Sequence, residues 1–106
     1  MSSTLRFGLS EDLILKLADL FSKHESIEEV ILYGSRAKGN FSKGSDIDLT
    51  LIAPKSNTSE LLKIANEIDD LMSPYKFDLS LYHQIESPEL IDHINRVGKS
   101  FFKKSI

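Results

Sequence analysis

Two aspartates separated by a single residue, Asp46 and Asp48, stand at the head of an apolar run and have the spacing of a reactive pair. Side chains alternate along a strand, so both carboxylates project from the same face. Carboxylates held so close raise each other's pKa unless a cation lies between them. The chain has no cysteine and this segment has no histidine. A hard cation with oxygen ligands, Mg²⁺ or Mn²⁺, is therefore favoured.

A Gly-Ser turn precedes the aspartates. Gly34 and Ser35 follow the apolar run 30–33, and ten residues separate Ser35 from Asp46. Small residues expose backbone N–H groups that can approach phosphate oxygens, and a short helix beginning at Ser35 would add its N-terminus to the anion site. The alternative is an ordinary turn serine. A carboxylate–metal pair beside such a turn indicates nucleotide chemistry.

These residues carry a family resemblance. Gly-Ser followed by Asp-x-Asp resembles the DNA polymerase β-type nucleotidyltransferase superfamily, and GSRAKG followed by SDIDL is similar to its minimal nucleotidyltransferase (MNT) group. The resemblance implies a third carboxylate on a later strand, a place that Asp78 matches. Arg36 and Gly39 also match, whereas Lys38 stands where the group often has Arg. The likeness is sharp over Val30–Ile52 and looser beyond it.

The resemblance implies that Asp46, Asp48 and Asp78 are the catalytic residues and the ligands of two Mg²⁺ ions, with Mn²⁺ as an alternative. Two ions about 3.5–4 Å apart clamp the attacking and leaving oxygens of an in-line displacement. The reaction implied is NMP transfer with release of pyrophosphate. The residues expected to bind the nucleotide are Gly34, Ser35, Arg36, Lys43 and Ser45.

Each assignment has a structural alternative. An isolated Asp-x-Asp is more often a pair at a strand start, but the preceding Gly-Ser and the later Asp78 favour the site. Arg36, Lys38 and Lys43 could equally be solvated cations. The histidines share no spacing and are interpreted as surface or helix-end residues, and the tyrosines as packing residues, although Tyr82 shares a strand face with Asp78.

Hydrophobic periodicity and capping residues predict the elements. The chain begins with a loose lead-in over Met1–Gly8, a helix capped by Ser10 and running to about His24, and a strand over Glu28–Tyr33. At most a short helix from Ser35 then leads to a strand over Asp46–Ala53, followed by a helix capped by Asn57 and stopped by Ser73-Pro74. The last elements are a strand over Lys76–Tyr82, a helix from Ser87-Pro88 to a C′ residue at Gly98, and a short edge strand at Phe101-Phe102. The second strand should run antiparallel to the first, and the third parallel to the second. The predicted fold class is α/β (α+β), a small mixed sheet with flanking helices and a polymerase β-type nucleotidyltransferase core.

Composition limits the function classes. The 106 residues are enough for one domain (1–106), with 41% hydrophobic and 27% charged residues. A net charge of −3 disfavours tight nucleic-acid binding and a template-directed polymerase. We expect no membrane contact, because no apolar run reaches spanning length, and a cytoplasmic location, because cysteine is absent.

The MNT resemblance also implies a partner. Proteins of this group are commonly paired with a helical HEPN-domain toxin, and act as its antitoxin by transferring AMP to it. The expected donor is ATP or another NTP, and the expected assembly is a hetero-oligomer with the HEPN protein. Two alternatives stay open: a small-molecule nucleotidyltransferase of the aminoglycoside-modifying type, and a non-catalytic antitoxin that neutralises its partner by binding.

Overall fold

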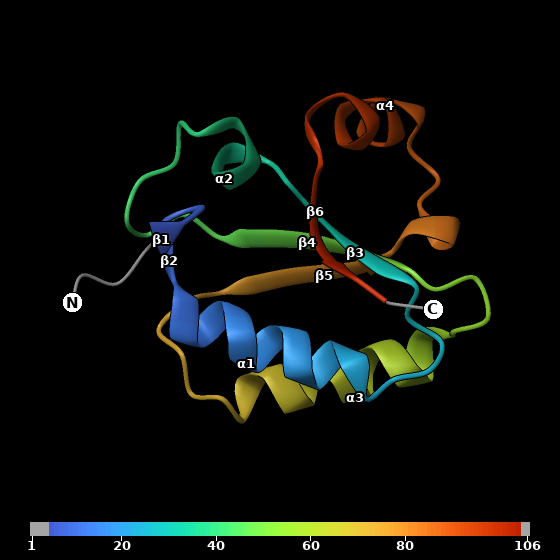
Figure 1. Cartoon of the computed structure of the whole chain (residues 1–106). Helices are drawn as coiled ribbons and strands as arrows, with labels where there is room; N and C mark the ends of the chain where they lie inside the picture. Colours follow the sequence, from blue (N-terminus) through green and yellow to red (C-terminus); the bar gives the residue numbers. More distant parts are fainter. Residues whose placement is uncertain (1–4, 105–106) are drawn as a thin grey trace.

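A four-stranded sheet forms the centre of the molecule, and the computed structural model describes residues 5–104 (Figure 1). The elements are β1 (Leu5–Arg6), β2 (Leu9–Ser10), α1 (Glu11–Ser22), β3 (Glu29–Tyr33), α2 (Ser35–Lys38), β4 (Ile47–Ile52), α3 (Thr58–Asp69), β5 (Phe77–Leu81), the 3₁₀ turn η1 (Tyr82–Gln84), α4 (Pro88–Val97) and β6 (Lys99–Lys103). The strand order is β5-β4-β3-β6. β3 runs antiparallel to β4 and β6, and β4 runs parallel to β5. The predicted mixed sheet and its strand directions are confirmed.

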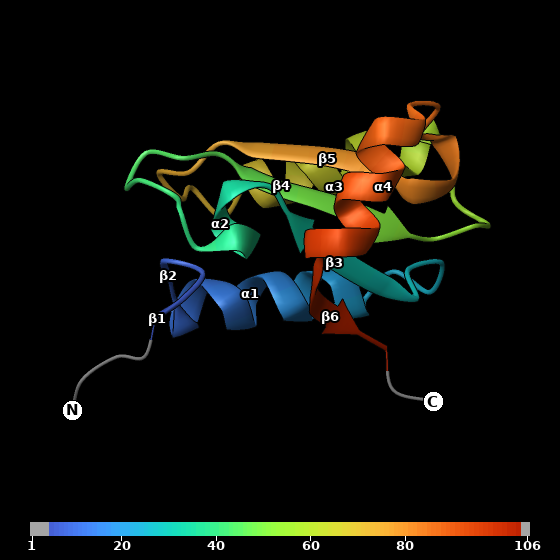
Figure 2. The ribbon, with the colours of Figure 1, turned by 90° about the horizontal axis from the view of Figure 1, so that it is seen from above.

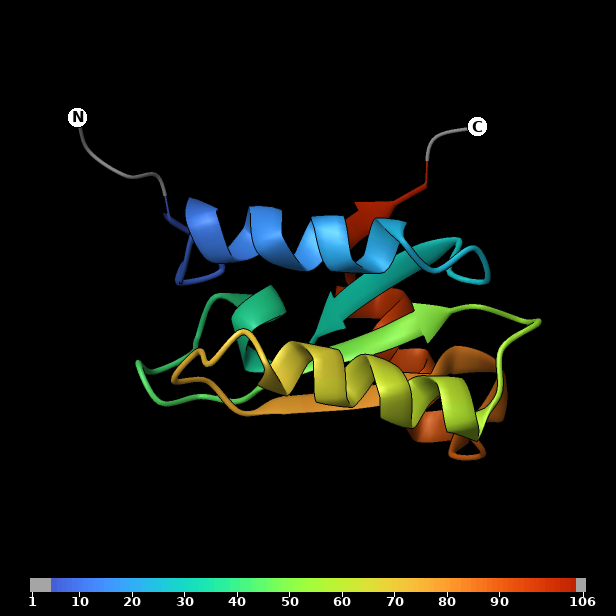
Figure 3. The same cartoon turned by 90° about the horizontal axis from the view of Figure 1, so that it is seen from below.

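The helices lie on both faces of this sheet. α1 and α3 cover one face, where Figure 3 shows them crossing the strands, whereas α2 and α4 lie on the other (Figures 1 and 2). Alternation along β4 sends Ile47, Leu49 and Leu51 into the core under α1 and α3, and all three are fully buried. None of the helices within residues 5–104 is long and apolar enough to cross a membrane.

Side-chain caps begin the three longer helices at the predicted residues. The side chains of Ser10, Asn57 and Ser87 each accept a hydrogen bond from the backbone N–H three residues later. Such a cap satisfies one of the N–H groups that have no partner within the first turn. Capping residues act locally, so the sequence located these helix starts correctly.

The predicted loose lead-in is wrong for residues 5–8, while residues 1–4 lie outside the described part of the chain. β1 and β2 form an antiparallel hairpin. Phe7 (φ 59°) and Gly8 (φ 76°) turn between them, and positive φ at both central residues is typical of a tight hairpin. The Phe7 ring packs against that of Phe101 in β6, with 6.3 Å between centroids. This non-local packing orders a segment without any apolar periodicity of its own.

Gly98 follows α4 as predicted, but for a different reason. A left-handed C′ residue was expected, whereas Gly98 is the C-cap with extended backbone at φ −61° and ψ 143°. A Cβ at this position would crowd the carbonyl oxygen of Ile94 and would lie 2.6 Å from a methyl group of Ile31 in β3. Glycine therefore allows the close approach of α4 to the sheet.

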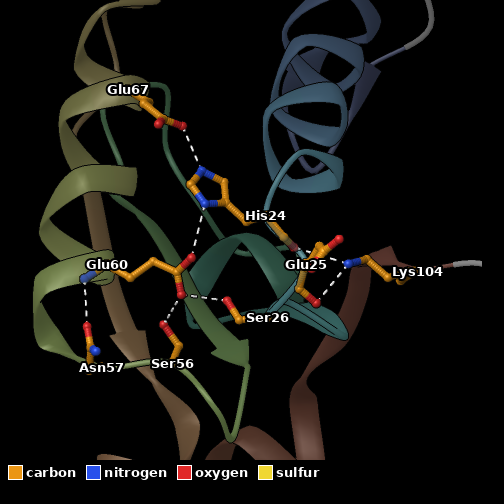
Figure 4. Close-up of polar contacts among 8 residues, drawn as sticks. All are labelled: His24, Glu25, Ser26, Ser56, Asn57, Glu60, Glu67 and Lys104. Carbon is orange, nitrogen blue, oxygen red and sulfur yellow. Dashed lines mark hydrogen bonds and ion pairs between the residues drawn. The ribbon is translucent and has the colours of Figure 1, made fainter.

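A polar network joins the end of α1 to α3 (Figure 4). The His24 imidazole lies between two carboxylates, with Nδ1 3.3 Å from Glu60 and Nε2 2.8 Å from Glu67. Each ring nitrogen of His24 thus faces a carboxylate of α3, so the imidazole links the end of α1 to two turns of that helix. Glu60 also accepts hydrogen bonds from Ser26 and Ser56. The Glu60 carboxylate thus contacts His24, Ser26 and Ser56, while its backbone N–H donates to the Asn57 side chain at the helix start.

This network predicts an acid-sensitive contribution to stability. Hydrogen bonds from Ser26 and Ser56, and then the bond and charge of His24, lower the pKa of Glu60 below its ordinary 4.5, whereas burial opposes the shift. A carboxyl whose pKa is lower in the folded state stabilises the fold above about pH 4.5, and this contribution is lost as pH falls through the lowered value. Glu60→Gln should lose about 1 kcal/mol of unfolding free energy at neutral pH, and part of the wild type's decline in acid should disappear.

Urea unfolding between pH 3 and pH 7 measures both effects. Glu86→Gln is the matched control, since Glu86 is exposed. Parallel pH curves for the wild type and Glu60→Gln would show that the network does not stabilise the fold.

Candidate functional site

The strand register places two of the three predicted carboxylates side by side. Asp48 of β4 pairs with Asp78 of β5 on one side and with Tyr33 of β3 on the other. Asp46 directly precedes β4 and stands two residues before Asp48, so the two side chains lie on the same face of the sheet. The three aspartates therefore belong to the face of the sheet opposite to α1 and α3, at the end where β4 and β5 begin. Asp46 and Asp78 are exposed, and Asp48 is half-buried.

The Gly-Ser turn lies directly against Asp48. Gly34 caps the one-turn helix α2 and has φ 77°, a conformation that disfavours residues with a Cβ. A Cβ at Gly34 would overlap a carboxylate oxygen of Asp48. Glycine is thus required here for two reasons, backbone conformation and space. The predicted turn and the predicted carboxylate form one site, although they are fourteen residues apart.

The carboxylates create an unbalanced negative charge. Burial raises the pKa of the Asp48 carboxyl, and the neighbouring Asp78 and Asp46 raise it further, whereas a positive charge on His93 acts in the opposite direction. The same environment raises the pKa of the Tyr33 hydroxyl, through burial and through Asp78 and Asp48, against a hydrogen bond from Ser80. A cation at this face would relieve the repulsion.

Oxygen donors of this kind suit a divalent hard cation. Within residues 5–104, however, no three acidic or histidine side chains converge closely enough to hold a metal ion as they stand. Asp78 and Asp46 both lie near enough to Asp48 to raise the pKa of its carboxyl. Their chemistry therefore fits a divalent cation, while the present side-chain positions do not form a closed set of ligands.

The predicted serines and lysines lie around the turn. The carbonyl of Ser35 accepts hydrogen bonds from the Gly39 and Asn40 amides, at 2.9 and 3.2 Å, which closes α2. The Ser45 hydroxyl accepts a hydrogen bond from the Ser42 amide at 2.9 Å and so braces the loop before Asp46. The side chain of Lys43, like that of Lys38, is exposed.

Arg36 has other partners than the predicted phosphate. The side chain is only 2% exposed. Its Nη1 donates to the Phe7 carbonyl at 2.8 Å, and its Nε and Nη2 donate to the Ser45 carbonyl at 3.2 and 2.9 Å. Nη2 also reaches the Lys43 carbonyl at 3.4 Å. The guanidinium thus joins the N-terminal hairpin to the loop that carries Asp46.

Two aromatic rings enclose the same guanidinium. The carbon Cζ of Arg36 lies 5.0 Å from the ring centroid of Phe41 and 5.0 Å from that of Tyr75. Both distances are within the range of cation–π attraction. With its ring contacts and its backbone carbonyls, Arg36 is committed to holding loops together, and in this arrangement it does not extend toward the carboxylates.

Two residues at the site were missed by sequence reasoning. Tyr33 was interpreted as a packing residue, but it lies in register beside Asp48. His93 was interpreted as a surface histidine, yet its ring meets that of Tyr33 edge-on, with 6.1 Å between centroids. The end of the first strand beside Gly34 could have identified Tyr33. No spacing in the sequence could have identified His93, because α4 reaches the site only through the tertiary fold.

One groove among the described residues lies away from the three aspartates. A groove of about 570 Å³ runs between α1 and α3, lined by residues such as Lys63, Glu67 and Leu71. It lies on the opposite face of the sheet from the three aspartates. The site is therefore recognised by the chemistry of its residues and not by the depth of a cavity.

Several solved structures with a similar fold are toxin–antitoxin complexes. One, a toxin–antitoxin with AMP-PNP, has a TM-score of 0.67 and 21% identity, and the match covers 90% of this chain and 74% of that chain. A second, the tri-AMPylated HEPN toxin of Shewanella oneidensis with its MNT antitoxin, has a TM-score of 0.67 and 17% identity over 89% of this chain and 72% of that one. A third, the toxin–antitoxin MntA-HepT, has a TM-score of 0.65 and 17% identity, and the match covers 89% of this chain and 73% of that chain. At such identities, the likeness establishes the fold.

The sequence itself identifies the family. No curated protein sequence matches the chain significantly. Residues 15–106, however, match the family described as Polymerase beta, Nucleotidyltransferase. This stretch begins within α1 and includes the Gly-Ser turn and all three aspartates. The predicted family is confirmed: the chain belongs to the polymerase β nucleotidyltransferase family.

Proposed function

We propose that this chain transfers AMP from ATP to a protein hydroxyl of a HEPN-domain toxin and thereby acts as its antitoxin. The observation that carries the proposal is the register that sets Asp48 beside Asp78, with Gly34 in contact with Asp48. This arrangement combines carboxylates for a cation with a turn for phosphate groups. The family supplies the reaction class, nucleotidyl transfer.

Asp46, Asp48 and Asp78 are the residues that would hold the divalent cations. Nucleotidyltransferases of this family generally use a divalent metal, and Mg²⁺ or Mn²⁺ suits an all-carboxylate set. Bound there, two such ions would neutralise the triphosphate and would lower the pKa of the acceptor hydroxyl. The pKa of Asp48, raised by burial first and then by Asp78 and Asp46, supports this proposal, because a bound cation would stabilise the charged carboxylates.

The chain's own residues would bind and orient the nucleotide. The backbone at Gly34 and Ser35 would donate N–H groups to the terminal phosphates. The exposed Lys43 is free to approach them, and Ser45 keeps the loop before Asp46 in place. In the reaction, the acceptor oxygen bonds to the α-phosphorus while the bond from that phosphorus to the pyrophosphate oxygen breaks. The hydroxyl proton passes to solvent.

Arg36 acts in this proposal as a positioning residue. It binds the carbonyl of Ser45, the residue before Asp46, and thus determines where the first carboxylate stands. The expected role in direct phosphate binding is replaced by this one, since its donors already have partners.

The partner is proposed from the structural relatives. One of them pairs an MNT antitoxin with a HEPN toxin that is tri-AMPylated, and another is a toxin–antitoxin with AMP-PNP. With ATP as the donor and a toxin as the acceptor, the chain would work inside the cell, in the cytoplasm. A tight complex with nucleic acid is not part of this function, in keeping with the net charge of −3.

The first prediction concerns nucleotide binding. Asp48→Ala should weaken Mg²⁺-dependent ATP binding at least about tenfold, because a triphosphate held without its cation is poorly neutralised. Calorimetry with and without Mg²⁺ measures the effect. Asp69→Ala, at the end of α3, is the control and should bind as the wild type does. Equal affinity for the wild type and Asp48→Ala under both conditions would remove Asp48 from the site.

The second concerns Arg36. Arg36→Lys should lower the unfolding free energy by about 2–4 kcal/mol, because one ammonium group cannot reach the carbonyls of Phe7, Lys43 and Ser45 together, and buried acceptors lose their partners. Lys38→Gln, on the same short helix but exposed, should change it by less than about 0.5 kcal/mol. Chemical denaturation compares the two variants. A loss of ATP binding in Arg36→Lys at unchanged stability would instead assign Arg36 to the phosphates.

The third concerns the partner. Co-expression with a HEPN-domain partner protein should add about 329 Da to that partner for each transferred AMP. Intact-mass spectrometry measures this, and both Asp46→Ala/Asp48→Ala and Asp78→Asn should abolish the addition. An unmodified partner that is nevertheless neutralised would favour inhibition by binding alone. A chain that modifies an aminoglycoside and no protein would favour the small-molecule function.

A further inference from the structure

His93 stands above the carboxylate site, on a helix that the catalytic motif does not include. α4 lies on the same side of the sheet as α2, and Figures 1 and 2 show the two helices apart from each other above the strands. The His93 ring meets the Tyr33 ring edge-on, at an interplanar angle of 81°. Tyr33 in turn is the register neighbour of Asp48. The imidazole therefore borders the site from the α4 side.

The position of His93 is determined by rigid neighbours. The adjacent Ile94 is 3% exposed and anchors α4 on the sheet. Gly98 allows the end of α4 to approach Ile31 of β3. The Tyr82 hydroxyl donates to the Asn95 side chain at 3.2 Å, which ties the middle of the helix to η1. A side chain on so constrained a helix is suited to orient a bound group.

The imidazole is also available for binding. Among the described residues, no hydrogen bond uses a ring nitrogen of His93, whereas His24 has both of its nitrogens engaged. His93 is half-buried. The ring thus combines proximity to the site with unused hydrogen-bonding capacity.

The geometry of in-line transfer gives this position a role. The leaving pyrophosphate and the attacking oxygen must lie on opposite sides of the α-phosphorus. If the terminal phosphates bind at the turn formed by Gly34 and Ser35, the acceptor enters from the side away from α2. His93 of α4 borders the site on that side.

We propose that His93 is an acceptor-side residue, whose ring nitrogen accepts a hydrogen bond from the acceptor hydroxyl and turns the oxygen toward the α-phosphorus. This inference rests on the proposed AMP transfer. It identifies α4 as the element that meets the partner's acceptor residue, separately from the turn and carboxylates that meet ATP.

Three variants at one position separate hydrogen bonding from packing. His93→Ala should reduce the rate of AMP transfer to the co-expressed HEPN protein about tenfold to a hundredfold, a range expected when a reacting group is misplaced. His93→Phe keeps a ring against Tyr33 but has no hydrogen-bond acceptor, so it should transfer AMP as slowly as His93→Ala does. His93→Gln keeps an acceptor and should recover part of the rate. His83→Ala, on the exposed η1 turn, is the control.

The binding of AMP-PNP with Mg²⁺ provides the second measurement. Under the proposal, all three His93 variants bind AMP-PNP with the wild-type affinity, and kcat falls while KM for ATP stays unchanged. Equal losses in binding and transfer would place His93 at the phosphates and overturn the proposal. Transfer by His93→Phe at the wild-type rate would also overturn it. If the wild type itself transfers no AMP to the HEPN protein, the proposed function fails, and the acceptor-side role fails with it.

Discussion

The buried guanidinium of Arg36 is the contact on which the arrangement of the site depends. Three segments that lack regular structure or have little of it meet there: the N-terminal hairpin, the loop before Asp46 and the segment around Tyr75. No carboxylate pairs with this cation within residues 5–104. Carbonyl oxygens and aromatic faces stabilise it instead. A buried charge satisfied in this way tolerates few substitutions, because every lost contact leaves a polar group without a partner.

β4 shows how one strand serves both the core and the site. Its even-numbered residues include Asp48, and its odd-numbered residues include Leu49, which is fully buried against the helices. A shift of one residue in register would bury the carboxylates and expose the apolar side chains. The free energy of core packing therefore maintains the register that pairs Asp48 with Asp78. The alternation of side chains along β4 thus links the stability of the core to the position of the carboxylates.

The two faces of the sheet have different tasks. The face under α1 and α3 holds the apolar core, and the network of His24 and Glu60 ties these helices together at one end. The other face carries the aspartates, with α2 and α4 above it. Separation of the faces allows charged groups to be concentrated without lowering the apolar burial that stabilises the domain.

Local spacing was sufficient to predict much of the molecule. Alternation placed Asp46 and Asp48 on one face, the turn residues located Gly34, and polar caps at Ser10, Asn57 and Ser87 located the helix starts. The third carboxylate needed the family resemblance as well as alternation, and the strand register then brought Asp78 beside Asp48. These features follow from residues close together in the chain, where backbone geometry decides what lies next to what.

The contacts of Gly98, Arg36 and His93 depend on the tertiary structure. Gly98 was recognised as a helix end, but its close contact with Ile31 depends on how α4 packs on β3. Arg36 stands in the motif like a phosphate ligand, yet its side chain finds carbonyls contributed by residues from 7 to 45. His93 has no sequence signal, and it reaches Tyr33 because α4 packs over β3. A long or helix-borne side chain takes its partners from whatever the fold brings within its reach, and residue spacing along the chain does not contain that information.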